Sequence, residues 1–291
     1  MNAPKVAVVI PVGSVDGALS YQVRSVLAQD TAWPFAVVLS LNTESEDARN
    51  AVARLIDELG DERLSCIDSS AIRGAAHARN AGLAASFADL VAFCDADDRV
   101  HDGWLAALIA GLDAHDAVTG RVVDVFPSPR MAHWHPPATP GALPTFLGTP
   151  YLLSGNLAVR RAAFDAVGGF DESLTRCEDI ALGWDLIRRG YSIGYVHAAG
   201  IDYAHRPGVR AMLRQHYMYG RGMSEVLARH GLPSEAGTET PRRVRTLRPN
   251  GQRASRRTIV GTMRRGAIAT GRIRGMIATR SSLSGEAQGG S

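Results

Sequence analysis

The chain has 291 residues, of which 45% are hydrophobic and 21% charged, and its formal net charge is +3. This length suffices for one α/β domain with a full core plus an appendage, and the composition is that of a globular protein. The sequence has no run of about 18 apolar residues that could form a membrane-spanning helix and no signal peptide at its start, so we expect a cytoplasmic protein.

Short apolar runs alternate with helically spaced segments in the first 112 residues. This pattern predicts strands at residues 6–10, 35–41, 64–67 and 90–94, and helices at residues 18–29, 46–59, 75–86 and 103–112. The alternation favours βαβ units and a mostly parallel sheet, which binds its ligand beyond the carboxyl ends of the strands. Candidate site residues are therefore those that directly follow each strand.

The second half of the chain has weaker periodicity. Residues 126–150 are rich in proline, which predicts one long loop. Helices are expected at residues 160–167, 179–189 and 209–230, and a strand at residues 192–196. The three cysteines, Cys66, Cys94 and Cys177, form no CxxC pair, which argues against a zinc site or a disulfide framework.

A cluster of acids follows the strand predicted at residues 90–94, in the segment Asp95-Ala96-Asp97-Asp98. Crowded carboxylates raise one another's pKa, and a hard cation such as Mg²⁺ or Mn²⁺ relieves that repulsion. The alternative is an acidic turn in which Asp98 or Asp102 caps the next helix. The position after a parallel strand favours the functional interpretation.

Two further segments carry candidate chemistry. Gly74 opens a helix that contains Arg79 and Asn80; helix starts attract phosphate, and arginine adds a planar fork of donors, although such residues are often simply solvated. Glu178 and Asp179 stand together at the start of another predicted helix. They either cap that helix or supply a general base to an acceptor hydroxyl.

In this order, the segments resemble the inverting glycosyltransferases of family 2, with the GT-A fold. The resemblance covers residues 6–207, about two thirds of the chain. The segments that carry it are the first strand with Pro11, Ser25-Val26-Leu27-Ala28-Gln29, Gly74 with Ala78-Arg79-Asn80, Asp95-Ala96-Asp97-Asp98, Gly155-Asn156, Val167-Gly168-Gly169-Phe170-Asp171, Glu178-Asp179 and His205.

The resemblance implies an α/β fold, with a Rossmann-like, mostly parallel central sheet flanked by helices. It implies an inverting, metal-dependent transfer of a sugar from a nucleotide-diphosphate donor to an acceptor hydroxyl, on a polysaccharide, a lipid-linked or a small-molecule acceptor. Asp179 would be the general base, with Glu178 as the other candidate. Asp97 would bind Mn²⁺ or Mg²⁺, and His205 would be a further metal ligand, a contact to the diphosphate, or a structural histidine.

The same resemblance assigns the remaining site residues. Gly155 and Asn156 would border the acceptor side of the cleft. The donor would be bound by Pro11, Gly13, Asn42, Gly74, Arg79, Asn80, Asp95, Ala96 and Asp97.

One departure from the family concerns the second strand, which usually ends in a pair of acids, one of which reads the nucleobase. Here the segment is Ser40-Leu41-Asn42-Thr43-Glu44, in which either Asn42 would hydrogen-bond the base edge, or Glu44 or Asp47 would substitute for the missing acid. Two alternatives therefore stay open beside the active enzyme. One is a catalytically silent, sugar-nucleotide-binding partner, and the other is a nucleotidyltransferase of similar architecture, although residues 11–17 lack the basic phosphate loop that it needs.

The C-terminal segment has a distinct charge. Residues 240–284 hold twelve of the 32 basic residues and no acid, which leaves 20 basic and 29 acidic residues elsewhere. We expect a transferase domain over residues 1–207, with a donor half to about residue 100 and an acceptor half after it, a helical extension over 208–232 and an arginine-rich tail over 233–291.

The arginine-rich tail has two interpretations. On a helical wheel, Ile268 falls among the arginines, whereas Arg274 intrudes on the apolar side formed by Ile259, Val260, Met263, Ile273 and Ile277. The tail is either disordered and solvated, or attached peripherally to the anionic inner face of a membrane, where a lipid-linked acceptor would lie. No nucleic-acid partner is expected, because no aromatic residue stands among these arginines.

Overall fold

The computed structural model describes residues 4–132, 134, 141–231 and 259–286, with the side chains of residues 262–276 in the last range. Contacts divide the chain into two units. Unit 1 comprises Met1–Val125 and Ala138–His205, and unit 2 comprises Phe126–Pro137 and Arg206–Ser291.

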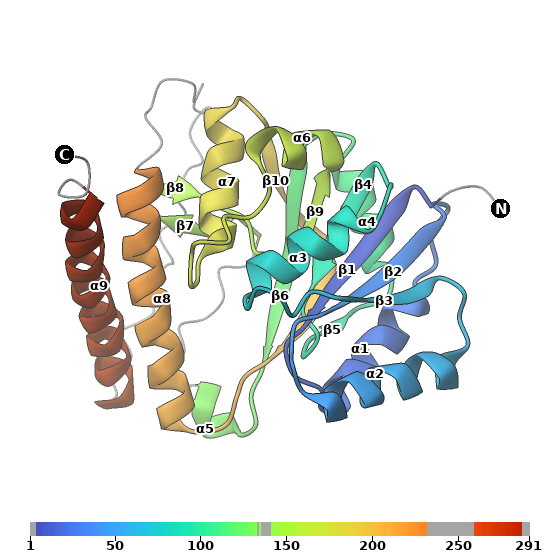
Figure 1. Cartoon of the computed structure of the whole chain (residues 1–291), viewed down its shortest axis with the longest axis horizontal. Coiled ribbons are helices and arrows are strands. Elements are labelled where there is room, and N and C mark those ends of the chain that lie inside the picture. The colour runs from blue at the N-terminus through green and yellow to red at the C-terminus, as the bar shows by residue number, and fades with distance from the viewer. Residues whose placement is uncertain (1–3, 133, 135–140, 232–258, 287–291) are drawn as a thin grey trace. The chain divides into compact units, whose positions relative to one another are not determined.

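Unit 1 is built on an eight-stranded sheet in the order β3-β2-β1-β4-β9-β6-β10-β5 (Figure 1). Its strands are β1 (Val6–Val12), β2 (Phe35–Leu41), β3 (Leu64–Asp68), β4 (Leu90–Cys94), β5 (Arg99–Val100), β6 (Ala117–Val125), β9 (Asn156–Arg160) and β10 (Ile193–Ala204). Strands β3, β2, β1 and β4 are parallel, whereas β9 pairs antiparallel with both β4 and β6. The mostly parallel sheet expected from the alternating pattern is thus confirmed.

Helices cover both faces of this sheet. Helices α1 (Gly17–Leu27), α2 (Glu46–Leu59) and α4 (Trp104–Gly111) bury their apolar side chains against one face. Helices α3 (Ala75–Ala84), α6 (Arg161–Val167) and α7 (Glu178–Arg188) bury theirs against the other. Because β1 is covered on both faces, its side chains are nearly all apolar and fully buried, as a central parallel strand requires.

Local signals in the sequence set the ends of α2. The Ser45 side chain accepts a hydrogen bond from the Ala48 N–H at 3.3 Å, and two acids occupy the first turn. The helix ends at Gly60, whose φ of 55° lies in the left-handed region that glycine adopts without strain. The bounds of this helix match those predicted from the sequence.

The segment predicted as one long loop contains regular structure, which corrects that expectation. Within it, α5 (Pro129–Ala132) lies in unit 2, and β7 (Thr145–Phe146) and β8 (Thr149–Pro150) form a hairpin in unit 1. Residues 133 and 135–140 lie outside the described part of the chain. The hairpin turns at Leu147 and Gly148, both with positive φ, and Phe146 stacks on Trp184 with ring centroids 5.7 Å apart.

Sequence periodicity missed β6, β9 and β5, and it predicted only the start of β10. Strand β10 continues to Ala204 because its pairing with β6 resumes after an irregularity between Val196 and Gly200. A bulge of this kind interrupts the period-2 pattern on which strand prediction rests.

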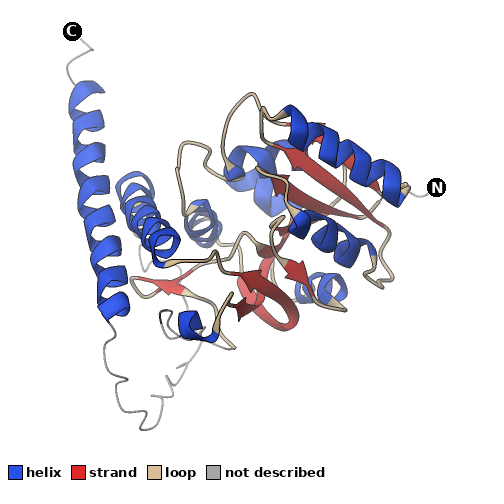
Figure 2. Ribbon diagram, turned by 90° about the horizontal axis from the view of Figure 1, so that it is seen from below, coloured by secondary structure: helices blue, strands red, loops and turns tan. Residues whose placement is uncertain are grey.

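Unit 2 contains two long helices, α8 (Val209–His230) and α9 (Ile259–Glu286), which pack on one another (Figure 2). Most of the predicted tail, residues 233–258 and 287–291, lies outside the described residues, whereas residues 259–286 form α9. In the described part of the chain, no helix combines the length and the apolar character that crossing a membrane would need.

Candidate active site

Parallel strands of unit 1 bring the candidate donor-binding segments to one edge of the sheet. Strands β1, β2, β3 and β4 are followed there by segments that begin at Gly13, Asn42, Ser69 and Asp95. Pro11 lies within β1, opposite Ser40 of β2, and Gly13 is exposed with open space around it. Asp97 is exposed and Ala96 half-buried in the turn after β4.

A fully buried glutamine of α1 fixes the turn after β4. The Gln22 side-chain amide donates to the Asp95 carbonyl oxygen at 2.9 Å, and its oxygen accepts from the Val100 N–H at 3.1 Å. The Gln22 side chain therefore holds the chain in place on both sides of Ala96, Asp97 and Asp98. Sequence reasoning missed Gln22, because a polar residue inside a helical pattern gives no sign of what its side chain bonds.

Arg79 links the acidic turn to the start of α7. Its guanidinium donates to Asp95 Oδ1 at 2.5 Å and to Glu178 Oε1 at 2.7 Å, and its side chain is only 3% exposed. Burial alone would lower the pKa of Arg79, but the carboxylates of Asp95 and Glu178 outweigh it and raise that pKa above its ordinary value. Two motifs 99 residues apart are thus joined by one buried cation.

The two acids at the start of α7 have different surroundings. Glu178 is held by Arg79, whereas Asp179 accepts a hydrogen bond from the Ile180 N–H at 2.8 Å. Burial, and next the charge of Glu178, raise the pKa of Asp179 to about 7. Neither acid caps the helix, because the capping position is Cys177, held at φ 67° without a side-chain cap. A non-glycine residue in this conformation is strained, and such strain is concentrated at functional sites.

Tyr151, just after β8, is a second residue that sequence reasoning missed. Burial, and next the charge of Asp179, raise the pKa of its phenol, so that it stays neutral and able to donate a hydrogen bond. The aromatic residue stands in an irregular segment, where nothing in the sequence connects it with α7.

Asp98 is a buried carboxyl group in the turn after β4. It is 4% exposed, and neither of its carboxylate oxygens accepts a hydrogen bond of good geometry from the described residues. Burial, followed by the charges of Asp95 and Asp97, raises the pKa of Asp98 to about 9. Neither Asp98 nor Asp102 caps the next helix, since α4 begins after Gly103 without a side-chain cap. The surroundings of Asp98 therefore disfavour its charged form.

This acidic segment fits a hard cation whose coordination is completed by substrate oxygens. The carboxylates of Asp95, Asp97 and Asp98 repel one another, and Mg²⁺ and Mn²⁺ commonly bind one or two carboxylates together with phosphates. Among the described residues, no group of three or more His, Cys, Asp or Glu side chains could hold a metal ion without such help.

His205, the other predicted metal ligand, is engaged with a neighbour in the described structure. Its Nε2 lies 2.8 Å from Asp124 Oδ1, and its side chain is 8% exposed. The structural interpretation of this histidine therefore has direct support, and a metal contact stays a prediction.

Asn42 and Gly74 are joined by the loop that follows β3. The Asn42 amide donates to the carbonyl oxygens of Ser69 and Ile72 and accepts from the Gly74 N–H at 2.9 Å. Both of its N–H donors are thus used to shape this loop. A contact with a nucleobase stays a prediction, for which one lone pair of the side-chain oxygen is left.

Asn80 anchors the glycine-rich turn before α7. Its amide donates to the Phe170 carbonyl oxygen at 2.9 Å and to Glu172 at 2.8 Å, and its oxygen accepts from the Phe170 N–H at 3.0 Å. The described contacts of this side chain are therefore with the protein. Donor binding by Asn80 stays a prediction.

Gly155 and Asn156, the two residues predicted on the acceptor side, differ in burial. Asn156 is fully buried, and its side chain bonds the Trp104 indole and the carbonyl oxygens of Arg121 and Ala199. Gly155 is half-buried beside the acidic segment. Only Gly155 is placed to border a bound molecule, and its acceptor contact stays a prediction.

The family of the chain is decided by comparison with known families. A model described as glycosyl transferase family 2 matches residues 7–168, and one described as glycosyl transferase family group 2 matches residues 90–260. The chain belongs to glycosyl transferase family 2. This confirms the family that the ordered motifs predicted.

Curated relatives match parts of this family 2 chain. It is 33% identical over 169 residues to the pre-mycofactocin glycosyltransferase of Mycobacterium tuberculosis, which covers 54% of the chain and 36% of that relative. It is also 33% identical over 140 residues to the succinoglycan biosynthesis protein ExoU of Rhizobium meliloti, covering 43% and 40%. The family 2 chain thus spans less than half the length of these relatives.

Solved structures confirm the fold. The mannosyltransferase PcManGT from Pyrobaculum calidifontis, in complex with GDP-Man and Mn²⁺, superposes on 99% of the family 2 chain and 76% of its own, with a TM-score of 0.63 and 18% identity. GalNAc-T7 with UDP, GalNAc and Mn²⁺ covers 77% of the family 2 chain and 52% of its own, with a TM-score of 0.56 and 15% identity. At these identities the likeness establishes the GT-A architecture alone.

Proposed function

We propose that the chain transfers a glycosyl group from a nucleotide-diphosphate sugar to an acceptor hydroxyl, with inversion at the anomeric carbon. The observation that carries this proposal is the difference in surroundings between Glu178 and Asp179. Arg79 occupies Glu178, whereas Asp179 keeps a pKa of about 7, close to the value that suits a general base at neutral pH.

The proposed step is a single displacement. The acceptor oxygen forms a bond to the anomeric carbon, the bond from that carbon to the diphosphate breaks, and the nucleoside diphosphate leaves with the bonding electrons. Asp179 accepts the proton of the acceptor hydroxyl as the bond forms. Attack on the face opposite the leaving group inverts the anomeric centre.

The acidic segment is proposed to bind the donor together with a divalent cation. Asp97, with Asp95 beside it, would hold Mn²⁺ or Mg²⁺, which when bound neutralises negative charge on the diphosphate. The raised pKa of Asp98 supports this assignment, because burial, followed by the charges of Asp95 and Asp97, disfavours a further negative charge there, and a bound cation would relieve that repulsion. GDP-Man and Mn²⁺ in the mannosyltransferase of similar fold provide a precedent for such a complex.

The names of the relatives refer to different products, so the acceptor is proposed only as a hydroxyl of a glycan, a lipid-linked molecule or a small molecule. A donor screen is therefore the first experiment. Uridine, guanosine and thymidine diphosphate sugars are added with and without Mn²⁺, and the melting temperature is followed. A ligand that binds only the folded state raises the melting temperature by mass action.

Turnover of the donor selected by the screen then tests whether Asp179 is the general base. Asp179→Asn is expected to lower kcat by about 10²- to 10⁴-fold with donor binding retained, as loss of a general base predicts. Asp57→Asn, on the exposed face of α2, is the control and is expected to leave turnover unchanged. Unchanged turnover in Asp179→Asn refutes the assignment of the base. A donor that binds the wild-type chain without any turnover instead favours a silent sugar-nucleotide-binding protein.

A further inference from the structure

The close packing of α8 on α9 determines which face of α9 the described residues leave uncovered. A Cβ atom at Gly220 would overlap the carbonyl oxygen of Ile268, and one at Gly271 would overlap that of Tyr217. A Cβ atom at Gly275 would come within 2.8 Å of Ser224 Cβ. The two backbones therefore approach as closely as glycine permits, along one side of α9.

This packing explains why Ile268 departs from the amphipathic pattern of the helical wheel. Ile268, which falls among the arginines, is the residue whose backbone meets Gly220 of α8. Ser224 Oγ adds a hydrogen bond to the Arg272 carbonyl oxygen at 2.9 Å. The side of α9 that carries Gly271 and Gly275 is therefore covered by α8.

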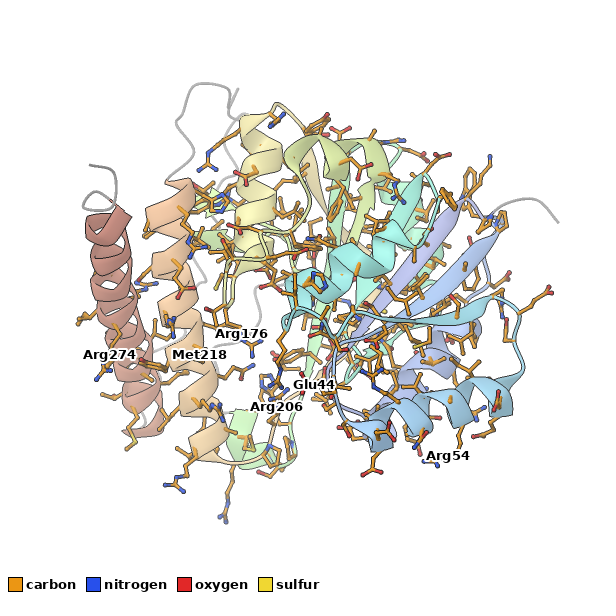
Figure 3. All side chains as sticks on the ribbon, viewed as in Figure 1. Glu44, Arg54, Arg176, Arg206, Met218 and Arg274 are labelled. Atoms are coloured by element: carbon orange, nitrogen blue, oxygen red, sulfur yellow. The ribbon has the colours of Figure 1, made fainter. Side chains whose placement is uncertain are left out.

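The outer face of α9 is an apolar strip between arginines. Ala269, Ile273 and Met276 are exposed and follow one another at helical spacing, with Ile273 55% and Met276 54% exposed. Exposed arginines stand to either side, Arg265 on one flank and Arg274 on the other, and Arg274 projects away from α8 (Figure 3). We call the face formed by these five residues the outer strip.

The outer strip has the composition of a helix that lies in a membrane interface. Such helices bury apolar side chains at the boundary between headgroups and acyl chains, while flanking arginines reach the lipid phosphates. Residues 240–284 contain no acid that would oppose an anionic surface and no aromatic residue of the kind that stacks on nucleic-acid bases. We propose that the outer strip of α9 binds the surface of an anionic lipid bilayer, with Ile273 and Met276 inserted and Arg265 and Arg274 on the phosphates.

Flotation of the full-length chain with lipid vesicles tests this proposal. We expect it to float with phosphatidylcholine vesicles that contain about a third phosphatidylglycerol, to stay behind with pure phosphatidylcholine, and to be released at high salt. The paired substitutions Arg265→Glu and Arg274→Glu are expected to weaken binding at least about tenfold. Ile273→Ser with Met276→Ser is expected to weaken it by a similar factor without changing the net charge.

The control reverses two charges elsewhere. Arg54→Glu with Arg189→Glu changes the net charge by the same amount at exposed positions of α2 and of the end of α7 (Figure 3 labels Arg54). We expect this variant to float like the wild-type chain, since the strip is intact. An equal loss of binding in the control overturns the proposal, because the interaction would then follow total charge.

A second copy of the chain is the competing occupant of the outer strip. If Ile273→Ser with Met276→Ser converts a dimer to a monomer in light scattering while flotation is unchanged, the strip is a subunit interface and the proposal is wrong. Equal melting temperatures of variant and wild type verify folding. The measurement uses neither donor nor acceptor, so its outcome is independent of the proposed transferase activity.

Discussion

Gly155 lies directly against the carboxylate of Asp95, since a Cβ atom at Gly155 would come within 2.8 Å of Asp95 Oδ2. The same Cβ atom would lie 3.5 Å from Asp98 Oδ2. The glycine thus leaves room for two of the acids that follow β4. Any larger residue would have to displace one of them.

Replacement of Gly155 tests how much the chemistry depends on the position of Asp95. Gly155→Ala is expected to lower kcat/KM by about 10- to 100-fold, because small displacements of positioned groups carry costs of this order. The control is Gly17→Ala, since Gly17 is exposed at the start of α1 with no atom within 4 Å of the added methyl group. If both variants keep full activity, the close approach has no role in positioning.

Arg79 is expected to be the most costly ion-pair partner to remove. Arg79→Met leaves Asp95 and Glu178 facing each other without a cation, and breaking a buried pair in this way costs about 3–5 kcal/mol of the free energy of unfolding. Because Asp95 is 32% exposed, we expect the lower end of that range. Urea unfolding measures the change.

The matched control for Arg79 is a surface pair. Arg24 lies 2.6 Å from Glu58, and both side chains are about half exposed or more. Arg24→Met is expected to change the free energy of unfolding by less than about 1 kcal/mol. Equal losses in the two variants would show that burial of Arg79 adds nothing to its ion pairs.

The pH dependence of the proposed reaction tests whether Asp179 is the general base. Only the ionised form accepts a proton, so kcat/KM is expected to rise with pH through the pKa of about 7 and to fall below it. The charge of Glu178 contributes to that raised pKa. Glu178→Gln is therefore expected to move the acid limb of the profile to lower pH. If the acid limb does not move, it is not caused by the ionisation of Asp179.

Asp98 is expected to make the metal-free protein less stable as the pH rises. Its pKa of about 9 exceeds the ordinary value of 3.8, so the folded state binds the proton more tightly than the unfolded state. The stability from this proton is present in full below pH 3.8 and is lost progressively up to about pH 9. With a chelator present, the melting temperature of Asp98→Asn is expected to exceed that of wild type by a margin that grows with pH. A difference in melting temperature that does not change with pH contradicts the raised pKa of Asp98.

Secondary structure was predictable where one residue pattern decides it. Strands β2 and β4 and helices α2 and α8 have the bounds expected from their apolar periodicity and end signals. Strand β9 was missed because Asn156 begins it: the residue is polar in sequence, yet its amide is satisfied by Trp104, Arg121 and Ala199 inside the core. Such compensation depends on three distant segments, so local sequence carries no sign of it.

The segments that form the candidate site could be predicted from the sequence, but the contacts among them could not. The motifs marked Asp95, Arg79 and Glu178, yet the buried bridge among them depends on the folded positions of β4, α3 and α7. Gln22 was missed for the same reason, since its two partners lie 73 and 78 residues away. Separations of that size are outside the range of any periodicity.

The pairing of β9 with β4 has a mechanical consequence. Cys94 and Asn156 are register partners in this antiparallel ladder, so Asp95 and Gly155 extend from the same rigid pair of strands. The proposed donor and acceptor sides of the site therefore cannot move apart without breaking hydrogen bonds of the sheet. For the proposed transferase, we therefore expect the movements that admit or release substrates to occur in loops outside this ladder.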